Sequence, residues 1–107
     1  MELTQAHLKK LEELHGRGFE IVAFPMYASY VGLRKGGCAV LIEPHGDAFK
    51  LFGQPSVLLD GNFSVRIRQE GRDWFVWKKQ RQEATPEIQK ELDDFRNEVS
   101  EALLINL

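Results

Sequence analysis

The sequence has very little cysteine and no long hydrophobic stretch. Cys38 is the only cysteine among the 107 residues, which excludes a disulfide within the chain and favours a reducing compartment. The N-terminal residues "MELTQAHLKK" lack the apolar core of a signal peptide, and no apolar run approaches the length of a membrane span. We therefore expect a cytoplasmic protein that does not associate with a membrane.

An excess of positive charge is also absent. The formal net charge is -2 at pH 7, so the composition gives no overall signature of nucleic-acid binding. Locally the charge is uneven: residues 66–81 carry six basic side chains against two acidic ones, whereas residues 83–101 carry seven acidic side chains against two basic ones. This segregation predicts either an internal pairing of the two segments or two separate binding surfaces.

Recognisable catalytic and metal-binding motifs are missing. The segment "EPHGD" places Glu43, His45 and Asp47 close together, with Cys38 earlier on the same predicted strand. The spacing matches no closed zinc motif, and a turn rich in Gly, Pro and Asp explains these polar residues by itself. We interpret Cys38 as a small hydrophobic strand residue. No Gly-rich phosphate-binding loop is found either. The sequence therefore predicts no metal site, no cofactor and no enzymatic activity.

A helix is predicted near each end of the chain. Thr4 is a plausible N-cap, and Leu8, Leu11 and Leu14 follow at helical spacing until "HGRG" ends the element. The histidines of this helix are assigned no chemical role. Thr85 followed by Pro86 predicts the start of a second helix. Its apolar stripe consists of Ile88, Leu92, Phe95, Val99 and Leu103.

Antiparallel strands are predicted between the helices. The turn at Gly36–Gly37 predicts a hairpin that pairs Leu33 with Val40 and Val31 with Ile42. Further strands are predicted for "FEIVAFP", "AFKLF", "FSVRIRQ" and "WFVWKK", whereas "GQPSVLLDGN" is expected to be irregular. With 43% hydrophobic and 28% charged residues, the chain has the composition of one globular domain, covering residues 1–107. We expect an α+β domain in which about five strands form a meander-like sheet, with both terminal helices packed on one face.

The run "DWFVWKK" is apolar on both sides of a strand, because successive side chains point to opposite faces. A two-residue turn after Gln69 would place Ile67 opposite Trp74 and Val65 opposite Val76. In that register the face under the helices is expected to hold Phe63, Val65, Ile67, Trp74 and Val76. The other face would carry Ser64, Arg66, Arg68, Phe75, Trp77 and Lys79. A three-residue loop or a bulge would exchange the aromatic residues between the faces.

The main question for the function is what covers the sheet face that points away from the helices. This face could be covered by one of four things: the irregular loop, a second copy of the chain, single-stranded nucleic acid or a small molecule. Our leading hypothesis is a small non-enzymatic domain that works as a homodimer or binds a partner protein. The dimer interface should include Trp74 or Trp77, whichever the register turns away from the helices. A nucleic-acid-binding module is the alternative, disfavoured by the net negative charge. The candidate interface residues are Arg66, Arg68, Trp74, Phe75, Trp77 and Lys79.

Overall fold

Two terminal helices flank antiparallel sheets, as the sequence predicts for an α+β domain. The computed structural model describes residues 2–105. In chain order the elements are α1 (Gln5–Gly16), β1 (Glu20–Val22), the short 3-10 helix η1 (Pro25–Tyr27), β2 (Val31–Lys35), β3 (Cys38–His45), β4 (Ala48–Leu59), β5 (Asn62–Phe63), β6 (Val65–Gln69), β7 (Arg72–Trp77), β8 (Gln80–Glu83) and α2 (Pro86–Leu103). The strands form two sheets, a five-stranded one in the order β1-β2-β3-β4-β5 and a three-stranded one in the order β6-β7-β8. Strands that follow one another in the chain are thus neighbours, as expected for a meander, but they form two sheets.

The first helix begins with a capping box in which histidine replaces the usual Glu or Gln. The Thr4 hydroxyl accepts a hydrogen bond from the His7 backbone N–H (3.3 Å), and His7 Nδ1 accepts one from the Thr4 N–H (2.9 Å). Because Nδ1 is an acceptor, Nε2 carries the ring proton and donates to the Ala48 carbonyl (2.8 Å). His7 is fully buried, with its ring 4.8 Å from that of Phe49. It therefore joins the start of α1 to the start of β4.

The β2–β3 hairpin forms in the predicted register. Leu33 pairs with Val40 and Val31 pairs with Ile42, around the turn at Gly36–Gly37. These side chains lie on the sheet face that α1 and α2 cover, and they belong to the main hydrophobic core. The predicted pairing thus places an apolar face under the helices.

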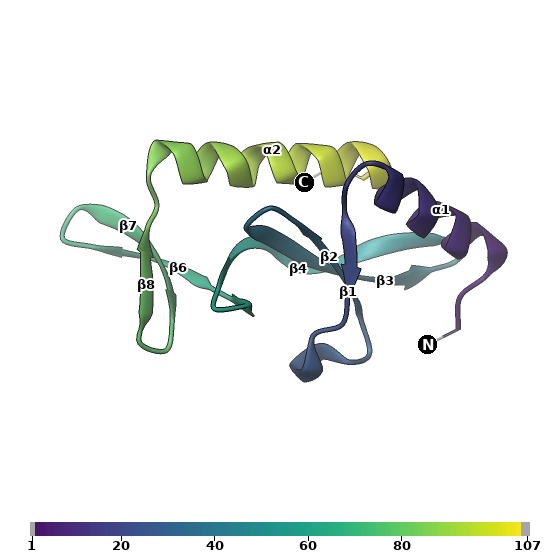
Figure 1. Cartoon of the computed structure of the whole chain (residues 1–107), viewed down its shortest axis with the longest axis horizontal. Helices are drawn as coiled ribbons and strands as arrows, with labels where there is room; N and C mark the ends of the chain where they lie inside the picture. The colour runs from purple at the N-terminus through teal and green to yellow at the C-terminus, as the bar shows by residue number, and fades with distance from the viewer. Residues whose placement is uncertain (1, 106–107) are drawn as a thin grey trace.

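The second helix lies across both sheets. The Thr85 hydroxyl caps it by accepting from the Ile88 N–H, and Pro86 occupies its first turn. Leu92, Phe95 and Val99 of the predicted stripe are buried. In Figure 1 the helix runs from the three-stranded sheet to the region of α1, along one side of the whole molecule.

The prediction that "GQPSVLLDGN" is irregular is wrong. Most of this segment continues β4, a strand of 12 residues that ends at Leu59. Opposite Val40 the strand bulges: Ala39 pairs with Ser56 and Leu41 with Phe52, so the residues 53–55 face a single β3 residue. Gly53 adopts a φ of 75°, which glycine tolerates best. The turn-forming residues therefore sit inside a bulge and do not end the strand.

The β6–β7 hairpin has the register of a two-residue turn, one of the alternatives that the sequence leaves open, but the assignment of faces expected for that register is wrong. Val65 lies opposite Val76 and Ile67 opposite Trp74. Phe75 is only 2% exposed, whereas Val65 is 62% exposed, so the helix covers the face that was expected to be outside. Alternation along a strand determines which residues share a face. It does not determine which of the two faces a helix covers.

Candidate interaction surfaces

One face of the three-stranded sheet is apolar and has no cover among the described residues. We call it the outer face; its apolar residues are Val65, Ile67, Trp74 and Val76. They form two neighbouring cross-strand pairs between β6 and β7. Val65 and Ile67 are 62% and 37% exposed, and Trp74 and Val76 are partly exposed. Trp74 is thus the tryptophan that the register turns away from the helices.

Charged side chains of both signs surround this apolar block. Arg81, opposite Val76 on β8, places its guanidinium 4.4 Å from the centre of the Trp74 ring. The same side chain donates a hydrogen bond to Gln69 Oε1 (2.7 Å). Arg72 and Glu83 approach to 3.8 Å beside it. The outer face therefore combines an aromatic and aliphatic centre with Arg and Glu at its border.

The opposite, inner face of this sheet packs toward α2 and carries three of the candidate residues. Phe75 is buried there, and the Arg66 guanidinium lies 5.8 Å from its ring. Arg66 donates to Asp73 Oδ2 (3.0 Å) and to Gln89 Oε1 of α2 (3.1 Å), while Arg68 donates to Asp73 Oδ1 (3.3 Å). The Arg66 hydrogen bond, with the positive charges of both arginines, lowers the pKa of the Asp73 carboxyl. Arg66, Arg68 and Phe75 are therefore not on the face that exposes Trp74.

The face of the five-stranded sheet away from the helices is covered by aromatic side chains. We call this surface the aromatic strip; its members are Phe24, Tyr27, Tyr30, Phe52, Phe63 and Trp77. The Phe63 ring lies 4.7 Å from that of Phe24 and 5.9 Å from that of Tyr27, and Tyr30 stacks on Phe52 at 4.1 Å. In Figure 1, η1 lies on the side of this sheet opposite to α2.

Sequence reasoning did not find the aromatic strip. Its signal was present in "FPMYASY", where Phe24, Tyr27 and Tyr30 recur every three residues around Pro25. Of the predicted interface residues, Trp77 lies in the strip and Lys79 borders the cavity next to it. The six predicted residues are consequently divided between the outer face, the inner face and the strip.

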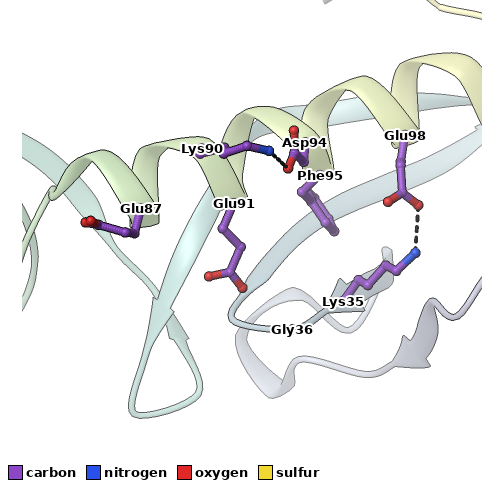
Figure 2. Close-up of a pocket in the computed structure, with 8 residues that line it drawn as sticks. All are labelled: Lys35, Gly36, Glu87, Lys90, Glu91, Asp94, Phe95 and Glu98. Atoms are coloured by element: carbon purple, nitrogen blue, oxygen red, sulfur yellow. Dashed lines mark hydrogen bonds and ion pairs between the residues drawn. The ribbon is translucent and has the colours of Figure 1, made fainter.

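A third surface feature lies between α2 and the β2–β3 turn. This cavity has a volume of about 320 Å³. In Figure 2, Glu91 reaches from α2 toward the turn and Glu98 toward Lys35 at the end of β2. Glu91 Oε1 accepts from the Gly37 N–H (3.0 Å), and Lys35 Nζ lies 2.7 Å from Glu98 Oε2. These contacts connect α2 to the β2–β3 hairpin, so a role in stabilising the fold accounts for them.

The acidic segment 83–101 does not neutralise the basic segment 66–81, because Arg72–Glu83 is the one ion pair between them among the described residues.

The residues around "EPHGD" are not brought together into a chemical site. Cys38 and His45 lie at opposite ends of β3, and Glu43 pairs with Lys50 (3.2 Å). Cys38 is buried in the core, where desolvation and the negative charge of Glu91 raise the pKa of its thiol to about 11. Across residues 2–105 no group of three or more His, Cys, Asp and Glu side chains is placed to hold a metal ion.

Within the part of the chain that the structure describes, neither helix has the length and apolar character needed to cross a membrane. Comparison with known proteins gives no relative: no family model, no curated protein and no solved structure matches this chain.

Proposed function

We propose that this chain is a non-enzymatic interaction domain that pairs with a second copy of itself through the outer face. The observation that carries the proposal is the exposure of Val65 and Ile67 directly beside Trp74 and Val76, on a sheet face that no described segment covers. A contiguous apolar patch of this kind is uncommon on a monomer and is typical of an interaction surface.

The free energy available from covering this face is substantial. A Trp side chain can bury about 150–250 Å² of surface. Trp74 and Val76 are already partly buried, so at roughly 25 cal/mol per Å² covering the remaining exposed surface of the four side chains is worth a few kcal/mol before the costs of association. Trp and Arg are also the residues most often found at the energetic centre of interfaces, and here Arg81 lies over the Trp74 ring.

The charges on this face favour a second copy as the partner. In a two-fold symmetric contact the same patch meets itself, so it must contain both members of every complementary pair. Arg72, Arg81 and Glu83 all border the outer face, and Arg of one copy can therefore meet Glu of the other. Such exposed pairs add little free energy, about 0–1 kcal/mol each, but they select the orientation.

The sheet face alone is smaller than a stable dimer requires. Strands of five residues spaced as in any β-sheet give a footprint of roughly 17 by 14 Å. A stable interface usually buries about 800 Å² on each partner. We therefore include in the proposed interface the charged border of the outer face, where Arg72 of one copy would approach Glu83 of the other.

The first prediction tests this assembly by light scattering after size-exclusion chromatography. At micromolar concentration the wild-type protein should have about twice the chain mass of 12.3 kDa. Val65→Glu should give a folded monomer, because a charged side chain is tolerated in water and not in a dry interface. Val65 is 62% exposed, so the fold itself does not depend on it.

A matched control uses the other surface of the molecule. Met26 is 72% exposed, and Met26→Glu makes the same change from an exposed apolar residue to Glu outside the outer face. This variant should remain a dimer. A wild-type protein that stays monomeric at high concentration, or a Val65→Glu variant that stays dimeric, would contradict the proposal.

A further inference from the structure

The aromatic strip contains three shallow cavities in a row. The first, of about 450 Å³, is bordered by Met26, Trp77, Lys78 and Lys79. The second, of about 60 Å³, shares Met26 and Trp77 with the first and is closed on its other side by Phe63. The third, of about 160 Å³, shares Phe63 with the second and ends at Phe52, Gly53 and Gln54. Neighbouring cavities therefore have common walls and together make one elongated groove.

The walls of this groove are aromatic along its length and cationic at one end. Met26 and Phe52 are 72% and 42% exposed, so much of the apolar surface is accessible to a ligand. Lys78 and Lys79 adjoin the first cavity, and the Lys78 ammonium lies 5.4 Å from the centre of the Trp77 ring.

The shape of the groove favours an extended ligand. A compact small molecule is usually held in one cavity that encloses most of its surface, whereas here three open cavities follow one another. Asn62 and Phe63 in the groove wall belong to β5, an edge strand of only two residues, which offers little backbone for a peptide that binds by adding a strand. A polyproline II segment needs no strand edge and is recognised by aromatic side chains that line a groove.

The charges select among extended ligands. Single-stranded nucleic acid requires cations along the whole track of its phosphates. In this groove Lys78 and Lys79 are confined to one end, and Asp60 lies beside them. A peptide with an acidic residue at one end of an apolar segment matches this arrangement.

We propose that the aromatic strip binds an extended proline-rich segment of a partner protein, with an acidic residue of that segment placed between Lys78 and Lys79. This surface is separate from the outer face, because Trp77 and Trp74 point to opposite sides of β7. The proposal is therefore independent of the homodimer.

The backbone at Lys78 makes Lys78→Gly a suitable test of its side chain. Lys78 has a φ of 51° at the first position of the β7–β8 turn. At the corresponding position two other hairpin turns have glycine, Gly36 and Gly46, and two have a larger residue, Asp60 and Glu70, with φ values of 51° and 53°. Glycine adopts this conformation without strain, so Lys78→Gly removes the ammonium and leaves the turn intact.

The second prediction is tested with Trp77 as a fluorescent reporter. The chain has two tryptophans, so Trp74→Phe leaves Trp77 alone. Titration with a synthetic oligoproline peptide ending in glutamates should change the Trp77 emission in a saturable manner. Phe52→Ala should weaken this binding by about fivefold or more, as expected for an aromatic contact in the groove. Lys78→Gly should weaken it by about two- to fivefold, as expected for loss of one exposed ion pair, while thermal stability is retained or raised.

Two other ligands serve as controls, and Val65→Glu in the same background serves as the matched variant outside the groove. A Gly/Ser peptide with the same glutamates should not bind, and neither should an oligothymidylate. Val65→Glu should leave peptide binding unchanged. Equal binding of the Gly/Ser peptide would reduce the effect to charge alone and overturn the proposal. Binding of oligothymidylate without binding of the proline peptide, or no saturable response to that peptide, would overturn it as well.

Discussion

At the scale of single residues, Gly32 leaves the space that Phe24 occupies on the face of the five-stranded sheet away from the helices. A Cβ atom at this position would lie 2.5 Å from a carbon of the Phe24 ring and 2.7 Å from the Val22 carbonyl oxygen. Neither distance is possible, and the carbonyl belongs to the neighbouring strand. The absence of a side chain therefore lets the Phe24 ring lie close to the backbone at Gly32, where it also contacts the Phe63 ring.

The third prediction follows from this contact. Gly32→Ala should displace Phe24 and lower the free energy of unfolding by about 1–3 kcal/mol, the usual cost of overpacking. Urea unfolding monitored by circular dichroism measures the change. Gly16→Ala is the matched control, since a Cβ there meets nothing within 4 Å, and it should be neutral or stabilising. Equal stability of Gly32→Ala and wild type would show that Phe24 does not depend on this space.

At the scale of elements, Asp73 on β7 holds two side chains of β6. Its carboxylate accepts from both Arg66 and Arg68, and the Arg66 hydrogen bond is the main cause of its lowered pKa. A carboxyl whose pKa is lowered in the folded state stabilises the fold above its ordinary pKa. That contribution is lost as the pH falls through the lowered value. The hairpin should therefore weaken at acid pH.

The fourth prediction is that Asp73→Asn makes the free energy of unfolding depend less on pH in the acid range. Wild-type stability should decline more steeply than that of the variant as the pH falls below about 4, where unperturbed aspartate becomes protonated. Urea midpoints for both proteins at a series of pH values provide the comparison. Parallel profiles would mean that the Asp73 contacts do not contribute to folding.

The elements also show where sequence patterns were sufficient. The β2–β3 register follows from its short turn and was predicted correctly. The β6–β7 register is the one that a two-residue turn gives, which was one of the alternatives that the sequence left open. The path of β4 was missed because Gly53 and Pro55 are compatible with a bulge as well as with a loop.

Tertiary contacts account for the errors at the candidate interaction surfaces. The pattern paired Phe75 with Arg66 correctly, yet contact with α2 decided that this face is the buried one. The aromatic strip joins residues from η1, β4, β5 and β7, which are far apart in the sequence. The local signal, the aromatic residues spaced by three in "FPMYASY", covers only one part of this surface.

At the scale of the whole molecule, the two sheets form an elongated body that α2 connects. Its extents are 48 × 26 × 20 Å, and Figure 1 shows the three-stranded sheet at one end. In the described residues this sheet supplies Phe75 to the hydrophobic core, with Ala84 following directly after β8. The five-stranded sheet contributes far more buried side chains. Phe75 is therefore the one residue of the three described strands that belongs to this core.

The fifth prediction is that Phe75→Ala destabilises the three-stranded sheet more than the five-stranded sheet. Removal of a buried Phe side chain typically costs about 3–5 kcal/mol. Native-state hydrogen exchange should show this loss in β6–β8, while the amides of β2–β4 keep most of their protection. The experiment is best done in the Val65→Glu background, so that self-association does not protect the outer face. A uniform loss across both sheets would instead indicate a single cooperative unit.

The spacing of the two tryptophans on β7 has a consequence for valency. Trp74 and Trp77 lie three positions apart, so one points to the outer face and the other into the aromatic strip. Self-association through Trp74 would leave both Trp77 grooves open and related by a two-fold axis. A ligand with two proline-rich segments joined by a linker of suitable length would then bind both grooves at once. Its avidity would exceed the affinity of a single groove by about 10²–10⁴, without any additional contact.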